Sequence, residues 1–170
     1  PERLRYRTPF KRADGSPAEL YSPLDAETVD LHFAWMREYG IDGAFMQRFV
    51  TEVRRPMGLY HFNTVLANAR SAANRHGRCY AVMYDLSGLE AGGTRALMDD
   101  WRLLVDRMRI GRDPNDRSYL RHRGRPVVAV WGIGFSDGRK YTLDECGRLI
   151  DWLRGDERYG GFTVMIGVPT

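Results

Sequence analysis

The stretch HGRCYAVMYDL, residues 76–86, decides the fold class, because a glycine closes a helical pattern in it and an apolar run follows at once. Glycine is common just past a helix C-terminus, since a residue there often needs a positive φ angle. A near-continuous apolar run is typical of a strand buried on both faces of a parallel sheet. The stretch therefore predicts the helix–strand unit of a parallel α/β fold.

The same join occurs three more times, at Gly40, Gly124 and Gly160. The four apolar runs predicted as strands are AFMQRFV (44–50), CYAVMYDL (79–86), PVVAVWGI (126–133) and FTVMIGV (162–168). Helical spacing of apolar residues precedes the first, second and fourth of these runs. It also occurs before residue 109, ahead of an aperiodic polar stretch over 111–125.

Capping residues mark the predicted helix starts. Asp25 stands before the first helical pattern and is predicted as its N-cap. The second helix is predicted from Asn63, and Thr142 with Glu145 predicts a capping box for the fourth. Residues 1–23 combine proline, glycine and charge without periodicity, so they are predicted to be an N-terminal loop segment.

The order of elements predicts part of a TIM-type (β/α)8 barrel. Four helices alternate with four parallel strands over residues 24–170, beginning with a helix and ending on a strand. A complete barrel needs about 250 residues, so the predicted domain is incomplete at both ends. The alternative is a small open parallel sheet that is complete as it stands. Against it, no glycine-rich phosphate motif such as GxGxxG or a P-loop follows any strand.

Composition is that of an ordinary globular protein, with 43% hydrophobic and 28% charged residues among 170. No apolar stretch reaches the roughly 18 residues that span a membrane, so no membrane partner is expected. The chain begins at Pro1 rather than methionine, which leaves room for an upstream signal peptide. Two cysteines without a CxxC motif, Cys79 and Cys146, are expected to be buried reduced thiols.

The net charge of +4 raises the question of a nucleic-acid partner. One basic cluster stands near the N-terminus, and no RNA-binding signature accompanies it. Its members are Arg3, Arg5, Arg7, Lys11 and Arg12. The preferred explanation of the charge is arginines spread over helix surfaces, so no nucleic-acid partner is expected.

Parallel α/β folds bind their ligands at the carboxyl ends of the strands. Asp85 stands at this end, where the second strand leaves the core. A carboxylate there can bind sugar hydroxyls, stabilise a developing positive charge or accept a proton. The alternative is an aspartate that caps the following loop through the backbone.

Gln47, Arg48, Tyr84 and Trp131 complete the candidate sugar-binding set on the strands. Arg48 either contacts the ligand or forms a bidentate ion pair with Asp85 on the adjacent strand. Trp131 either stacks on the apolar face of a sugar ring from the barrel mouth or fills the core against a helix.

His61 precedes the predicted start of the second helix, at the favoured end of the sheet. It either donates to a ligand oxygen or is incidental, because no matched partner stands near it in the sequence. No HxH, HExxH or carboxylate cluster occurs, so no metal and no other cofactor is expected.

Several segments together resemble the barrels of glycoside hydrolase families 99 and 71. The resemblance is greatest to bacterial family-99-like proteins labelled xylosidase/arabinosidase or endo-α-mannosidase-like, and it covers nearly all of residues 20–170. The segments that carry it are TVDLHFAWMREYGIDGAFMQRFV (28–50), HGRCYAVMYDLSGL (76–89), DDWRLLV (99–105), YLRHRGRPVVAVWGIGF (119–135) and YGGFTVMIGVPT (159–170).

The resemblance implies a (β/α)8 barrel that hydrolyses α-linked glycans with acidic residues. It also implies frequent export, to the periplasm or outside the cell. The family carries paired glutamates in an E-W-x-E type motif on a later strand, and this chain has no such motif. Glycoside hydrolysis needs two carboxyls, roughly 5–10 Å apart, so Asp85 alone is insufficient. The expectation is that this segment supplies part of the sugar-binding wall and that the main catalytic pair lies outside it.

Three hypotheses follow, in order of preference. The first is a segment of a glycoside hydrolase, inactive by itself. The second is a carbohydrate-binding barrel without catalysis. The third is a basic nucleic-acid module, whose affinity would fall steeply with added salt. Half a barrel would also expose two unpaired sheet edges and an open apolar face, so the isolated segment is expected to aggregate, dimerise or stay partly molten.

Overall fold

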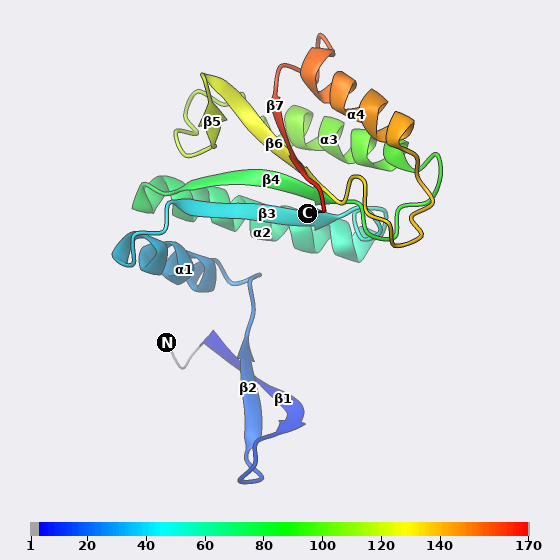
Figure 1. Ribbon diagram of the computed structural model, residues 1–170. Coiled ribbons are helices and arrows are strands. Elements are labelled where there is room, and N and C mark those ends of the chain that lie inside the picture. Colours follow the sequence, from blue (N-terminus) through cyan, green and yellow to red (C-terminus); the bar gives the residue numbers. More distant parts are fainter. Residues whose placement is uncertain (1–3, 170) are drawn as a thin grey trace.

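A four-stranded parallel sheet with helices along it forms the body of the protein in a computed structural model, which describes residues 4–169 (Figure 1). The strands are β3 (Gly43–Phe49), β4 (Cys79–Asp85), β6 (Arg125–Trp131) and β7 (Thr163–Gly167), side by side in that order. Each adjacent pair is parallel. The predicted mixed α/β fold with four parallel strands and four helices is therefore confirmed.

The four helices alternate with these strands along the chain. They are α1 (Ala26–Glu38), α2 (Pro56–His76), α3 (Thr94–Met108) and α4 (Leu143–Gly155). Helix α2 begins seven residues before the predicted Asn63, because Pro56 occupies its first turn, where a missing N–H costs nothing. The capping box of Thr142 and Glu145 is present at the start of α4. Asp25 is the N-cap residue of α1, but its side chain makes no capping hydrogen bond.

The glycine joins have two different structural origins. Gly77 ends α2 in the left-handed conformation with φ of 62°, as its position predicts. Gly124 instead lies in a tight turn between β5 (Arg121–His122) and β6, which pair antiparallel. Gly160 follows α4 by several residues, since that helix ends at Gly155. The strands after Gly124 and Gly160 were predicted correctly, but the helix ends there were wrong.

Residues 1–23 were predicted to be loop, and this is wrong for most of the segment. Strands β1 (Arg5–Lys11) and β2 (Pro17–Tyr21) form an antiparallel hairpin that extends away from the sheet (Figure 1). Its turn is built by Asp14, whose carboxylate accepts hydrogen bonds from the backbone and hydroxyl of Ser16. Strand periodicity was invisible in the sequence because most side chains of this hairpin are exposed on both faces.

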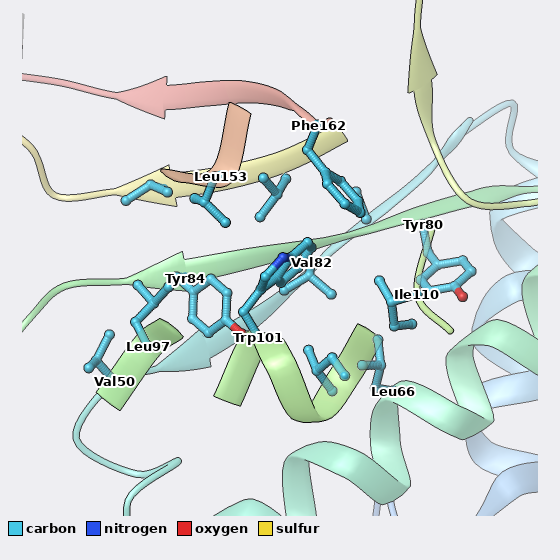
Figure 2. Close-up of a cluster of buried hydrophobic side chains, with 14 of the residues drawn as sticks. Val50, Leu66, Tyr80, Val82, Tyr84, Leu97, Trp101, Ile110, Leu153 and Phe162 are labelled. Atoms are coloured by element: carbon cyan, nitrogen blue, oxygen red, sulfur yellow. The ribbon is translucent and has the colours of Figure 1, made fainter. Parts of the chain in front are cut away.

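The core lies between the sheet and helices α2, α3 and α4 (Figure 2). Trp101 of α3 is fully buried at its centre. The Trp101 ring packs edge-on against Phe162, with 4.7 Å between centroids, and against Tyr84, with 6.2 Å. Val82 and Leu153 extend this layer from β4 and α4. Because these side chains come from distant parts of the chain, the core joins the helix–strand units into one body.

The sheet has two unlike faces, which its register defines. The helix-covered face includes the aligned rows Met46–Val82–Val128–Val164 and Arg48–Tyr84–Val130–Ile166. The opposite side, here the open face, carries three further rows: Phe45, Ala81, Val127 and Thr163; Gln47, Met83, Ala129 and Met165; and Phe49, Asp85, Trp131 and Gly167. In β3 the exposure alternates accordingly, with residues 45, 47 and 49 exposed. Among the described residues, no helix packs over the open face.

Candidate functional site

The candidate site lies where three parallel strands end together. Phe49, Asp85 and Trp131 are direct register partners on β3, β4 and β6. Side chains of register partners project from the same face of a sheet, so these three share the carboxyl-end row of the open face. Gln47 stands one row earlier on the same face. The expectation that Gln47, Asp85 and Trp131 share one end of a parallel sheet therefore agrees with the structure.

Asp85 is held by hydrogen bonds to both of its carboxylate oxygens. The side-chain amide of Gln47 donates to Oδ2 at 2.6 Å, and the backbone N–H of Ser87 donates to Oδ1 at 2.8 Å. The second bond is the loop cap that was weighed as the alternative to a functional role. The residue is only 5% exposed. Because the carboxylate is buried, a ligand hydroxyl reaches it by taking the place of the exposed Gln47 amide, and the oxygen then accepts from the hydroxyl instead.

Trp131 projects from the open face rather than into the core. Its side chain is 43% exposed, and its ring lies over Gly167 of β7. A Cβ atom at Gly167 would lie 2.0 Å from Trp131 Cε3, so only glycine admits the indole there. Phe135 extends the aromatic surface, with ring centroids 5.7 Å apart. An exposed indole beside a carboxylate is an arrangement that can hold a ring with an apolar face and hydroxyl edges.

Arg48 and Tyr84 lie on the helix-covered face, away from this row. The predicted Arg48–Asp85 ion pair is wrong, because Arg48 binds Asp100 of α3 instead. Its Nη2 donates to Asp100 Oδ1 at 2.6 Å and its Nε donates to Oδ2 at 2.9 Å. The Tyr84 hydroxyl donates to the same Oδ2 at 2.6 Å. Strand alternation separates Arg48 from Asp85, since neighbouring positions point to opposite faces.

Burial keeps this network out of reach of a ligand in the present conformation. Arg48 is 1% exposed and Tyr84 is 0% exposed. Burial raises the pKa of Tyr84 well above its ordinary value, with the nearby Asp100 carboxylate acting in the same direction, so the hydroxyl stays neutral. Both residues were predicted to bind substrate. Both side chains are packed in the interior, and these buried positions do not support that role.

His61 lies within α2 rather than in front of it, because the helix begins at Pro56. Its exposed ring stands edge-on to Phe62, with 5.8 Å between centroids. Among the described residues it makes no hydrogen bond with Gln47 or Asp85. The structure therefore does not bring His61 together with the other candidates.

A cleft of about 230 Å³ lies beside this row, between the loop after β4 and the loop after β6. It is lined by Ser87, Gly88, Leu89, Glu90, Asp137, Gly138, Arg139, Lys140 and Tyr141. Arg139 donates to the Tyr141 hydroxyl at 2.8 Å, which donates to the Gly132 carbonyl at 2.6 Å. Tyr141 was not among the predicted site residues, because no periodicity marks a residue that loops position.

Comparison with protein-family models and with curated proteins found no match for this chain. Among the described residues, no group of three or more histidine, cysteine, aspartate or glutamate side chains is placed to hold a metal ion. No helix in the described part of the chain is both long and apolar enough to cross a membrane.

Proposed function

We propose that this chain is part of a glycoside hydrolase-like (β/α)8 barrel that acts on α-linked glycans. Its share of the site is the sugar-binding wall formed by Gln47, Asp85 and Trp131. The main catalytic carboxylates lie outside this segment, because Asp85 is the only carboxylate in the three open-face rows. The proposal also rests on the resemblance of the strand segments to families 99 and 71.

One observation carries the proposal. Asp85 and Trp131 are register partners on adjacent parallel strands, at the end of the sheet where such folds bind ligands. The Asp85 carboxylate can accept sugar hydroxyls while the exposed Trp131 indole offers its face to the ring carbons. Gln47 orients the carboxylate from the next row, and its own amide oxygen is available to a further hydroxyl.

The test is titration of the protein with α-linked manno-, xylo- and arabino-oligosaccharides, followed by tryptophan fluorescence and calorimetry. We expect Trp131→Ala to weaken binding roughly tenfold, the size of one lost aromatic contact. Asp85→Asn is expected to weaken it as well, because the amide that replaces the carboxylate is a weaker acceptor. Equal affinity of these variants and the unsubstituted protein would contradict the proposed wall.

Matched controls separate loss of the site from loss of the fold. Trp35 of α1 is 47% exposed, close to the value for Trp131, and Trp35→Ala is expected to leave the affinity unchanged. Asp151→Asn, on an exposed position of α4, is the control for Asp85→Asn.

The second candidate is a carbohydrate-binding barrel without catalysis, favoured by the hydrogen bonds that occupy both oxygens of Asp85. Hydrolysis of aryl α-glycosides by the longest natural form of the protein distinguishes the two. Turnover by the unsubstituted protein would exclude the non-catalytic candidate, and glycan binding without turnover would support it.

A further inference from the structure

The cleft between the loops after β4 and β6 opens directly beside the proposed sugar-binding wall. Residues 87–90 line one side of it and residues 137–141 line the other. The backbone N–H of Ser87 donates to Asp85 Oδ1 at 2.8 Å, so Ser87 belongs both to the cleft and to the surroundings of the Asp85 carboxylate. A ligand bound at the wall therefore has a neighbouring space into which it can extend.

Packing and hydrogen bonds hold Arg139 in one geometry within the cleft. Its Nε and Nη2 donate to the two carboxylate oxygens of Asp137 at 2.8 and 3.0 Å, and its Nη1 donates to the Tyr141 hydroxyl at 2.8 Å. The guanidinium carbon lies 4.7 Å from the centroid of the Phe135 ring, which itself lies 5.7 Å from the Trp131 ring. A continuous series of contacts thus runs from the wall into the cleft.

Arg139 and Asp137 still have hydrogen-bonding capacity for a ligand. A guanidinium carries five N–H donors, of which the bonds above use three. Each carboxylate oxygen of Asp137 can accept a second hydrogen bond, and this side chain is 54% exposed. The hydrogen bonds from Arg139 lower the pKa of Asp137, so its carboxylate stays ionised. A fixed donor beside a fixed acceptor suits neighbouring sugar hydroxyls, because every hydroxyl both donates and accepts.

The formal charges of the cleft cancel. Asp137 is paired with Arg139, and Lys140 Nζ lies 2.8 Å from Glu90 Oε2, which joins the two loops. The other lining residues are uncharged. An acidic ligand group would meet two carboxylates, and each cation of the lining is already paired, whereas neutral hydroxyls can bond to members of both pairs. The cleft is therefore suited to a neutral ligand that is rich in hydroxyl groups.

The size of the cleft limits what it can hold. Pockets that enclose a drug-sized ligand measure roughly 300–1,000 Å³, so a cleft of about 230 Å³ fits a smaller unit. We infer that the cleft is a second sugar subsite, which takes the neutral monosaccharide unit next to the unit on Trp131. Asp137 is its main hydroxyl acceptor, and Arg139 orients Asp137. This inference rests on the proposed function and narrows its substrate class to neutral α-linked glycans of at least two units.

The test compares one-unit and two-unit ligands by calorimetry, with the longest natural form of the protein. The ligands are the methyl α-glycosides of mannose, xylose and arabinose and the matching α-linked disaccharides. A sugar that binds is expected to bind about tenfold tighter as the disaccharide, the size of one hydrogen bond to a charged group. Asp137→Ala should remove most of this gain and leave the affinity for the methyl glycoside unchanged.

The matched control is Asp151→Ala, which removes an exposed carboxylate of α4 outside the cleft. It should leave both affinities unchanged. Circular dichroism of each variant checks that the fold is intact. Equal loss of affinity for the methyl glycoside and the disaccharide in Asp137→Ala would show that Asp137 only supports the wall, and this would overturn the second subsite.

The charge argument is tested with an acidic ligand. A disaccharide whose terminal unit is a uronic acid should bind about tenfold more weakly than the neutral disaccharide, because its carboxylate would lie near those of Glu90 and Asp137. Glu90→Gln leaves Lys140 without its acidic partner and should narrow this difference. Equal or tighter binding of the acidic disaccharide by the unsubstituted protein would overturn the assignment to neutral glycans.

Trp131→Ala distinguishes failure of the subsite from failure of the proposed function. This variant should weaken the methyl glycoside and the disaccharide alike, because the wall binds the unit that both ligands share. If it does so while the disaccharide binds no tighter than the methyl glycoside, or while Asp137→Ala keeps the full gain, the wall stands and the second subsite is wrong. If no sugar of either length binds, the proposed function and the subsite are both wrong.

Discussion

At the scale of single residues, Arg48 is a buried cation whose partner comes from a distant helix. Its ion pair with Asp100 has side chains that are 1% and 2% exposed. Removing one member of such a pair leaves the other charge buried and uncompensated, which typically costs about 3–5 kcal/mol. We therefore expect Arg48→Met to lower the free energy of unfolding by about this amount, measured by urea denaturation.

The control replaces both members. Arg48→Met with Asp100→Leu removes the orphaned carboxylate, and we expect it to recover most of the lost stability, although the Tyr84 hydroxyl then loses its acceptor. A double variant as unstable as the single one would show that the side chains matter through shape rather than charge.

At the scale of elements, the start of α4 depends on one capping box. Thr142 Oγ1 accepts from the Glu145 backbone N–H at 3.2 Å, and Glu145 Oε2 accepts from the Thr142 N–H at 2.8 Å. The Gly92 N–H also donates to Glu145, which ties α4 to the loop before α3. We expect Thr142→Ala to cost about 1 kcal/mol in the free energy of unfolding, measured at neutral pH.

The same box predicts a pH dependence. Backbone hydrogen bonds from Thr142 and then Gly92 lower the pKa of Glu145 in the folded protein. A carboxyl with a lowered folded pKa stabilises the fold above its unfolded pKa, and this contribution disappears as pH falls through the folded value. Glu145→Gln should therefore lose less stability on acidification than the unsubstituted protein. Glu157→Gln, outside the helix, is the control. It should lose as much stability on acidification as the unsubstituted protein.

At the scale of the whole molecule, the hairpin of β1 and β2 stands apart from the core. From Leu4 onward, no residue before Val29 belongs to the buried hydrophobic cluster. The hairpin meets the start of α1 through the edge-on pair of Tyr21 and His32, with 5.2 Å between centroids, and through the Tyr6 hydroxyl, which donates to Asp25 Oδ1 at 3.0 Å. Removal of residues 1–22 should therefore leave the α/β body folded, at a cost of about 1 kcal/mol, the size of one aromatic pair.

Far-UV circular dichroism and urea denaturation of the shortened chain test this, beside the full chain at equal concentration. Tyr21→Ala in the full chain is the matched comparison and should reproduce most of the loss. A shortened chain without a cooperative transition would mean that the hairpin is needed for folding.

The amino-acid sequence by itself determined the buried strands, which recur along the chain as apolar runs. The four apolar runs after Gly40, Gly77, Gly124 and Gly160 are strands, and their carboxyl ends carry Gln47, Asp85 and Trp131 as expected. Such elements are predictable because a buried strand needs a continuous local run of apolar residues. The exposed hairpin has no such run, which is why it was predicted as loop.

Only the tertiary structure decided how the polar side chains are paired and which face each one occupies. Arg48 and Gln47 are adjacent in sequence, yet one binds Asp100, 52 positions away, and the other binds Asp85, 38 positions away. Strand alternation sends these neighbours to opposite faces, and the packing of α3 then brings Asp100 to one of them. The partners of a buried charge depend on contacts between distant segments, and no local spacing records them.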